Sequence, residues 1–314
     1  MQTRRIGRLD ASVIGIGCNN FGWRMDAART DAVVGAALEV GINLFDTADV
    51  YGGTQSEELL GKALGARRDD VLIATKFGSA LDGTAGEAGG VTGGAAPSYV
   101  RRAAEGSLRR LGTDRIDLYQ LHRPDEATPI GDTLAALDEL VVEGKVREIG
   151  CSNFSAGQLD EAAAAVAGGA ARFVSVQNNY SILHREPEPE VLEACGRLGM
   201  SFLPFFPLAS GLLTGKYRAG EPPAAGTRFG SDPRRAERDM TPERMATVSA
   251  LSELAGEAGA TLLELAFAWL LARDAVASVI AGATRPDQVR ANAATATFEA
   301  SPDLLARIDE IAPR

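Results

Sequence analysis

Four polar side chains suggest the chemistry of this sequence because three of them stand where apolar runs end. The four are Asp46, Tyr51, Lys76 and His122. The apolar or mainly apolar runs that lead into Asp46, Lys76 and His122 are 43–45, 71–75 and 116–121, and Tyr51 follows Asp46 by five residues. A charged side chain is rarely buried unless it has a partner, so a lysine directly after a strand indicates function. The spacing predicts one polar site at the ends of successive strands.

These residue types together can polarise and protonate a carbonyl group. A tyrosine phenol has an ordinary pKa near ~10, so it needs a neighbouring cation to act as a general acid near neutral pH. Lys76 is the candidate cation, and Asp46 can hold it charged and oriented. His122 can donate a hydrogen bond to an oxygen that gains negative charge.

Other reaction types fit the sequence less well. Ser152 lacks a G-x-S-x-G motif around it, which disfavours acyl transfer. His184 is the only other histidine, and no Cys/His spacing fits zinc. Schiff-base chemistry at Lys76 remains an open alternative, because an adjacent carboxylate and tyrosine are compatible with it.

Protonation of a carbonyl oxygen is half of a reduction, and a nicotinamide cofactor is the usual hydride source. Later strand ends offer contacts for it: Ser152, Asn153 and Gln177 for a carboxamide, Phe205 for ring stacking, and Pro207, Leu208, Ser210 and Gly211 for the backbone around a pyrophosphate. The segment Gly282, Ala283, Thr284 and Arg285 precedes a helix and can take a further phosphate, although Arg285 can equally be a solvated surface charge. The substrate is expected between the long loops 78–97 and 214–240, near Trp23 and Phe77.

The elements that position these residues alternate between strands and helices. About eight such units occur without a linker, which predicts a single-domain (β/α)8 barrel, a TIM barrel, over residues 1–314. Strands at 3–9 and 12–17, with a turn at 9–11, predict an N-terminal β-hairpin. A Rossmann fold is disfavoured because the segment 15–20 lacks the third glycine of G-x-G-x-x-G.

The chain resembles the aldo-keto reductases over nearly its whole length. The motifs that carry the resemblance are the segments 45–52, 74–78, 117–122, 150–154, 177–181 and 207–216. The resemblance implies a catalytic tetrad of Asp46, Tyr51, Lys76 and His122, and NADPH bound across the barrel mouth. The C-terminal half is similar to the branch with potassium-channel β subunits and bacterial reductases, which implies further cofactor contacts at Lys216, Arg228, Gly282, Thr284, Gln288 and Asn292. Phe205 stands where many members have Tyr or Trp, and Ala291 where the branch often has Glu.

Composition narrows the class of partner and the setting. The net charge of −10 without a long basic run argues against nucleic acids and anionic membranes as partners. Cys18, Cys151 and Cys195 form no C-x-x-C pair, and the N-terminus lacks an apolar signal segment, which favours a reducing cytoplasmic setting. No interface pattern predicts an oligomeric state.

The leading hypothesis is an NADPH-dependent reductase of aldehydes or ketones. The preference for NADPH over NADH rests on the resemblance and on Arg228 and Arg285. A redox-sensing nicotinamide-binding module and a Lys76 Schiff-base aldolase remain the alternatives. The sequence does not distinguish aldehyde, ketone, sugar and quinone substrates, nor the direction of reaction.

Overall fold

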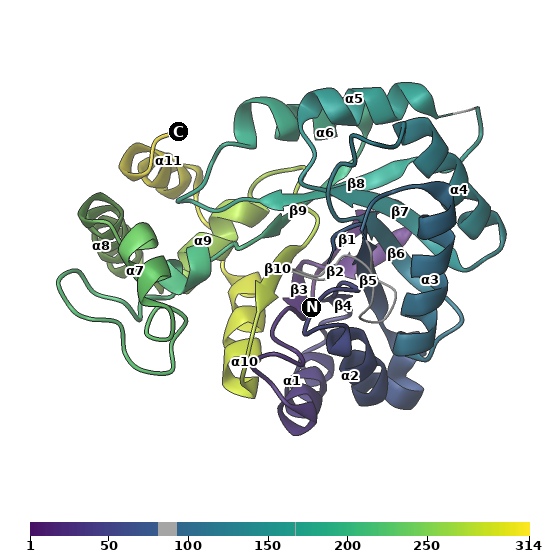
Figure 1. Ribbon diagram of the computed structural model, residues 1–314. Helices are drawn as coiled ribbons and strands as arrows, with labels where there is room; N and C mark the ends of the chain where they lie inside the picture. The colour runs from purple at the N-terminus through teal and green to yellow at the C-terminus, as the bar shows by residue number, and fades with distance from the viewer. Residues whose placement is uncertain (81–92, 167) are drawn as a thin grey trace.

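A computed structural model describes residues 1–80, 93–166 and 168–314. Its centre is a parallel sheet of eight strands in the order β10-β3-β4-β5-β6-β7-β8-β9, with helices around it (Figure 1). Parallel bridging between Phe202 in β9 and Val276, just before β10, brings the two edges together. The predicted (β/α)8 barrel is therefore confirmed.

The strands lie close to the segments expected from the apolar runs. They are β3 Ile14–Gly17, β4 Leu44–Asp46, β5 Leu72–Phe77, β6 Ile116–Leu121, β7 Val146–Ser152, β8 Phe173–Asn179, β9 Ser201–Phe205 and β10 Val279–Gly282. The helices are α1 Ala27–Glu39, α2 Gln55–Leu64, α3 Pro97–Leu111, α4 Ile130–Val142, α5 Ala156–Ala165, α6 Glu193–Leu198, α7 Pro233–Asp239, α8 Pro242–Glu257, α9 Leu262–Leu271, α10 Pro286–Ala294 and α11 Pro302–Ile311. Four short helical segments are η1 Gly65–Asp70, η2 Glu188–Leu192, η3 Ala209–Thr214 and η4 Thr295–Thr297.

The predicted N-terminal hairpin is present, but its predicted turn is wrong. The hairpin consists of β1, Thr3–Ile6, and β2, Leu9–Ser12, and the turn lies at residues 7–8. Gly7 has a φ of 56°, which a glycine adopts without strain, so the chain reverses there and not at 9–11. The segment 12–17 then supplies the end of β2 and the first barrel strand, β3.

Alternation along each strand divides the core into two layers. One layer fills the barrel and includes Leu44, Leu72 and Leu118 together with Ile6 and Leu9 of the hairpin. The other layer lies between the strands and the helices. Since the hairpin contributes to the inner layer, it plugs the end of the barrel where the strands begin and leaves their carboxyl ends for the site.

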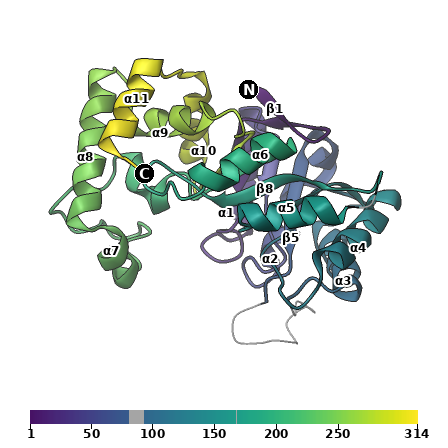
Figure 2. The same ribbon diagram turned by 90° about the horizontal axis from the view of Figure 1, so that it is seen from above.

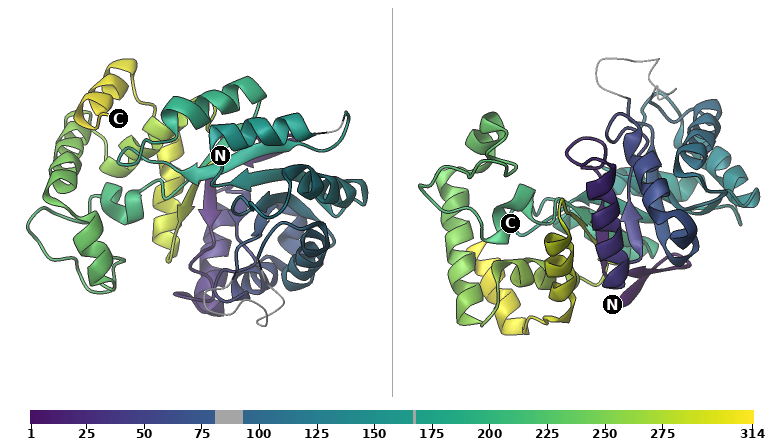
Figure 3. Two further views of the ribbon diagram at one scale, coloured as in Figure 1. Left: turned by 45° about the horizontal axis from the view of Figure 1, so that its top comes forward. Right: turned by 90° about the horizontal axis from the view of Figure 1, so that it is seen from below.

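Helices α7, α8 and α11 lie to one side of the barrel (Figure 2). Helix α7 lies at the end of the barrel opposite the hairpin, as Figure 2 and the right-hand view of Figure 3 show. Part of the predicted substrate loop 78–97 lies outside the described residues. Within the described part of the chain, no single helix has both the length and the apolar character to cross a membrane, while α8 and α9 pass that test only as a bent pair.

Candidate active site

Strand register brings the predicted tetrad together at the carboxyl ends of β4, β5 and β6. Asp46 is in register with Ala74 of β5, and Lys76 is in register with Gln120 of β6. His122 directly follows β6, and its backbone N–H donates to the carbonyl of Phe77 at 2.8 Å. Tyr51 lies in the turn that connects β4 to α2.

Lys76 and Asp46 form a buried ion pair. The Lys76 Nζ lies 2.6 Å from Asp46 Oδ2 and also donates to the carbonyl of Thr47 at 2.9 Å. The Lys76 side chain is fully buried, and that of Asp46 is 4% exposed. Burial lowers the pKa of Lys76, but Asp46 and Tyr51 outweigh it, so the net pKa lies above the ordinary value. The amine is therefore held as an ammonium, which disfavours Lys76 as a Schiff-base nucleophile.

Two amides hold the other oxygen of Asp46. Gln120 Nε2 donates to Asp46 Oδ1 at 3.2 Å, and Gln177 Nε2 donates to the same oxygen at 2.8 Å. Gln177 was expected at a cofactor carboxamide, whereas its N–H group points to the carboxylate of Asp46. Together with Lys76, these amides fix the orientation of Asp46.

The predicted lowering of the Tyr51 pKa does not occur. Burial raises this pKa, while Lys76 lowers it both by its charge and by a hydrogen bond, and the net pKa is above the ordinary value. The Lys76 Nζ lies 5.2 Å from the centroid of the Tyr51 ring. Lys76 therefore acts in the predicted direction, but the low-dielectric surroundings of the phenol have the larger effect. Tyr51 remains a protonated phenol at neutral pH and so can serve as a proton donor.

His122 faces Tyr51 and is neutral at physiological pH. Their ring centroids are 5.8 Å apart in an edge-on arrangement. Burial lowers the pKa of His122 to about 3, and the charges of Lys76 and Arg123 act in the same direction. Its Nδ1 is buried and has no hydrogen-bond partner among the described residues. A neutral imidazole can donate one hydrogen bond to a carbonyl oxygen placed between it and Tyr51.

The end of β7 lies beside His122. Asn153 Nδ2 donates to the carbonyl of His122 and to Ser152 Oγ, each at 3.0 Å. Ser152 Oγ donates to the carbonyl of Gln177 at 2.7 Å. Asn153 has a φ of 62°, a conformation that asparagine adopts more readily than most residues. The predicted carboxamide contacts Ser152 and Asn153 are thus fixed at one strand end.

The segment after β9 has several residues with positive φ values and lies against the cationic side chain of Lys216. Phe206, Ala209 and Ser210 all have positive φ values, of 51°, 45° and 60°. Gly211 follows with a φ of 102°, and a Cβ there would lie 2.9 Å from the Nζ of Lys216. Non-glycine residues in this conformation store strain that commonly occurs at ligand sites. Among the other residues predicted here, Phe205 and Leu208 are half-buried and Pro207 is buried.

The predicted phosphate segment precedes α10. Gln288 Oε1 accepts hydrogen bonds from the N–H of Thr284 at 2.8 Å and from its hydroxyl at 3.2 Å. Arg285 is exposed and pairs with Asp287, with both hydrogen bonds at 3.0 Å. Gly282 is exposed, and Asn292 is buried. Gln288 therefore holds Thr284 in place within the segment, while Arg285 is already paired with the carboxylate of Asp287.

The prediction that Phe77 contacts substrate is wrong. Phe77 is fully buried, and its ring stacks on Tyr119 with centroids 4.7 Å apart. Successive strand residues point to opposite faces, so Lys76 facing the barrel requires Phe77 to face the helices. Trp23, by contrast, is 62% exposed, and the guanidinium of Arg24 lies 4.6 Å from its ring centroid.

Sequence reasoning missed a group of buried acids and their partners behind the tetrad. Glu57 is fully buried and accepts from Thr75 Oγ1 at 2.6 Å and from Arg110 Nε at 2.7 Å. Asp49 is fully buried, and burial followed by the charge of Glu57 raises its pKa to about 8. The alternation of side chains along β5 could have indicated this group, because Thr75 must face the helices if Lys76 faces the barrel interior.

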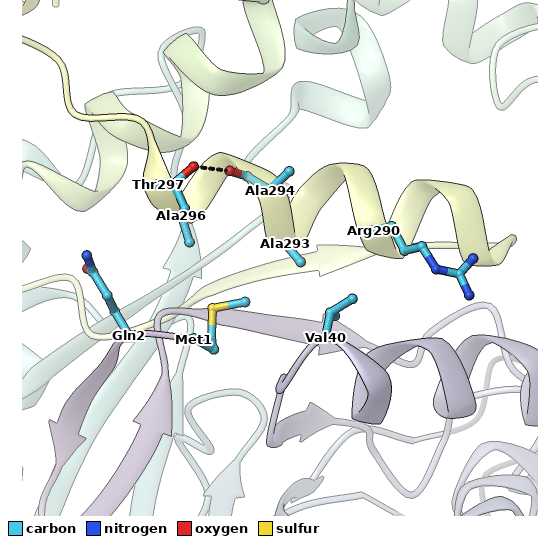
Figure 4. Close-up of a pocket in the computed structure, with 8 residues that line it drawn as sticks. All are labelled: Met1, Gln2, Val40, Arg290, Ala293, Ala294, Ala296 and Thr297. Carbon is cyan, nitrogen blue, oxygen red and sulfur yellow. Dashed lines mark hydrogen bonds between the residues drawn. The ribbon is translucent and has the colours of Figure 1, made fainter.

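A hollow of about 640 Å³ lies elsewhere, between the N-terminus, the end of α1 and α10 (Figure 4). Its lining is mainly apolar, and the one charged residue, Arg290, pairs with Glu39 at 2.8 Å. Figure 4 shows the Thr297 hydroxyl bonded to the carbonyl of Ala294 within this wall. The hollow contains none of the tetrad residues.

The mouth of this parallel (β/α)8 barrel therefore holds a buried Lys–Asp pair, a phenol and a neutral imidazole. The Aldo/keto reductase family model matches residues 13–313. The chain belongs to the aldo/keto reductase family. Members of this family are oxidoreductases that generally use a nicotinamide cofactor on carbonyl compounds.

Individual relatives cover nearly the whole chain. A probable voltage-gated potassium channel subunit beta of Oryza sativa subsp. japonica is 34% identical over 306 residues, which is 93% of this chain and 90% of the relative. Aldo-keto reductase YhdN of Bacillus subtilis is 35% identical over 290 residues, which is 90% of this chain and 84% of the relative. The structure of aldo-keto reductase AKR11C1 from Bacillus halodurans, in its holo form, is 33% identical with a TM-score of 0.81, covering 99% of this chain and 96% of that one.

Proposed function

We propose that this protein reduces an aldehyde or ketone to an alcohol with NADPH. The observation that carries the proposal is the convergence of the Lys76–Asp46 pair, the Tyr51 phenol and the neutral His122 at one end of the barrel. No nucleophile or second histidine is needed for this chemistry. The bound nicotinamide supplies the hydride.

The four side chains divide the work on the carbonyl oxygen. His122 donates a hydrogen bond that orients the oxygen and stabilises the charge developing on it. The Tyr51 hydroxyl delivers the proton, and the ammonium of Lys76 stabilises the phenolate that remains. Asp46 keeps Lys76 charged and in place through the 2.6 Å ion pair. In this arrangement Tyr51 transfers the proton, the Lys76–Asp46 pair supports Tyr51, and His122 positions the carbonyl oxygen.

The residues at the mouth fit a dinucleotide phosphate. Ser152 and Asn153 offer a fixed polar edge, and Phe205 offers a ring face. Gly211 leaves room for Lys216 to approach the backbone of η3. The remaining proposed contacts are Pro207, Leu208, Ser210, Arg228, Gly282, Thr284, Gln288 and Asn292. We expect Gln177 and Arg285 to contribute less to cofactor binding, because Gln177 already bonds to Asp46 and Arg285 already pairs with Asp287.

Two titrations and a turnover assay test the proposal. We expect saturable quenching of intrinsic fluorescence by NADPH, at least tenfold weaker binding of NADH, and NADPH oxidation on adding an aldehyde or ketone. Absence of binding by either nucleotide contradicts the proposal. Equal affinity for both removes the assignment of NADPH while leaving the reductase chemistry in place.

A second candidate is a nicotinamide-dependent binding module. It is favoured by the 34% identity to plant proteins described as probable voltage-gated potassium channel β subunits. Nucleotide-dependent capture of a partner, together with no turnover on a panel of carbonyl compounds, is the result expected for this candidate.

A further inference from the structure

We propose that Asp125 is a positioning residue, which fixes the backbone around His122 by holding Ala95 against the connection between β6 and α4. Asp125 lies three residues after His122 and belongs to none of the contacts described above. In this role it acts through His122 and not by contact with the carbonyl compound. Its effect on turnover rests on the proposed function, whereas its effect on the His122 ring can be measured without turnover.

The carboxylate of Asp125 accepts three hydrogen bonds. Its Oδ2 accepts from the backbone N–H of Ala95 at 2.7 Å and from Thr128 Oγ1 at 2.8 Å. Its Oδ1 accepts from the backbone N–H of Ala127 at 3.0 Å, which closes an Asx turn in the connection. Burial raises the pKa of Asp125, but these three hydrogen bonds outweigh it, so the net pKa lies below the ordinary value. Asp125 is therefore a charged acceptor at neutral pH, and charge-assisted hydrogen bonds are stronger than neutral ones.

The backbone of Ala95 is held at both its N–H and its carbonyl. The N–H donates to Asp125, and the carbonyl accepts from the hydroxyl of Thr133 in α4 at 2.9 Å. Ala95 is 1% exposed and lies two residues before α3, which packs beside α4 (Figures 1 and 2). Two side chains from the β6–α4 part of the barrel thus fix the segment that leads into α3.

Backbone contacts extend this restraint to His122. The N–H of Gly94 donates to the carbonyl of Gly78 at 3.0 Å. Gly78 has a φ of 101°, which a glycine adopts without strain. A Cβ on Gly78 would lie 3.3 Å from the carbonyl oxygen of Gly94 and 3.9 Å from the backbone nitrogen of His122. The neighbour of Gly78 in β5 is Phe77, whose carbonyl accepts the N–H of His122 at 2.8 Å. A displaced segment 94–95 therefore shifts the strand end that holds His122.

The direction of the His122 ring depends on its backbone. The Nδ1 is buried without a hydrogen-bond partner in the part of the chain that the structure describes, so no bond from that atom orients the ring. Asn153 Nδ2 holds the carbonyl of His122 at 3.0 Å, and the end of β5 holds its N–H. A hydrogen-bond donor stabilises developing charge only when it is accurately placed, and a displacement of about 1 Å can cost about a hundredfold in rate. Asp125 is therefore expected to affect kcat.

Kinetics of matched variants test this role. Asp125→Ala removes all three hydrogen bonds, so we expect kcat to fall about tenfold to a hundredfold, while KM and the Kd of NADPH change by less than about threefold. Asp125→Asn keeps an acceptor oxygen for Ala95 and should restore most of kcat. Glu126→Ala removes the same charge from the next residue, which is exposed, and should behave as the wild type does.

Heteronuclear NMR of the imidazole rings reports on His122 without turnover. The chain has two histidines, so His184→Asn assigns the signals. We expect Asp125→Ala to shift the His122 signals and to leave those of His184 in place, while Glu126→Ala shifts neither. Thr133→Val removes the other hydrogen bond to Ala95 and should shift the His122 signals by a smaller amount.

Three results overturn the proposal. One is a raised KM with an unchanged kcat in Asp125→Ala, which would place Asp125 in substrate binding alone. Another is an equal loss of kcat in Asp125→Ala and Glu126→Ala, which would reflect charge alone. The third is an absence of any shift of the His122 signals in both Asp125→Asn and Thr133→Val, which decides the matter if Asp125→Ala does not fold. A wild-type protein without turnover contradicts the proposed function, while a shift of the His122 signals in Asp125→Ala still supports the positioning role.

Discussion

The protonation state of His122 gives a stability prediction that depends on a single side chain. Burial and the charges of Lys76 and Arg123 lower its pKa to about 3, while the unfolded chain has the ordinary value of 6.5. The imidazole is therefore neutral in the folded protein and takes up a proton on unfolding below pH 6.5. The folded pKa is depressed, so the full stability is present above pH 6.5 and falls as the pH approaches 3.

The size of this effect at pH 5 follows from the unfolded pKa. The unfolded histidine gains its proton over about 1.5 pH units between 6.5 and 5, at about 1.36 kcal/mol per unit, so His122 costs about 2 kcal/mol of unfolding free energy at pH 5 relative to pH 8. The figure hardly changes if the folded pKa is about one unit higher, because pH 5 still lies above it. This cost belongs to His122 and not to the carboxylates, which titrate in every variant alike.

Urea denaturation at pH 8 and pH 5 measures the cost. The wild type should lose about 2 kcal/mol more than His122→Asn between the two pH values. The matched control His184→Asn alters the other histidine, which is 31% exposed, and should retain the loss due to His122. Equal pH dependence in the wild type and His122→Asn would refute the neutral, buried imidazole.

Two further substitutions test the ion pair and the strained turn. Lys76→Met leaves Asp46 buried without its cation, so urea denaturation should show a loss of about 3–5 kcal/mol in unfolding free energy. A steady-state assay should show at least a hundredfold loss of kcat. An unchanged unfolding free energy would contradict the buried ion pair. Gly211→Ala places a Cβ 2.9 Å from Lys216 Nζ at a φ of 102°. We expect urea denaturation to show about 1–3 kcal/mol of destabilisation, and titration to show about tenfold weaker binding of NADPH. The control Gly157→Ala adds a Cβ in open space within α5, so it should lower neither the stability nor the affinity for NADPH.

The succession of strands, and the gathering of three polar side chains at their carboxyl ends, could be predicted from the sequence because both depend on local pattern. Apolar runs locate strands, and a parallel barrel places every strand's carboxyl end at one mouth, so Asp46, Lys76 and His122 had to converge. The segment 116–121 is observed as β6 with the predicted bounds. These predictions did not depend on whether a given side chain points into the barrel or toward the helices.

Predictions that depended on side-chain direction were less successful. Phe77 was expected near the substrate, between the two long loops, although strand alternation turns it to the opposite face from Lys76. Gln177 was assigned to the cofactor, but its N–H group bonds to Asp46, a partner 131 residues away. The pKa of Tyr51 was expected to fall, whereas burial raises it more than Lys76 lowers it. Packing between residues far apart in the chain determines these side-chain directions and the pKa of Tyr51, and the spacing of residues in the sequence does not predict that packing.

The proposed mechanism requires Tyr51 to donate the proton, and Tyr51→Phe removes that donor. The substitution removes one hydroxyl and keeps the ring beside His122, so the fold and the affinity for NADPH should be preserved. Single-turnover reduction of an aldehyde at saturating NADPH, with the Kd of NADPH measured on the same sample, separates chemistry from binding. We predict an unchanged Kd and a rate of reduction lower by about two to four orders of magnitude. A rate within a few-fold of the wild type would contradict the assignment of Tyr51 as the general acid.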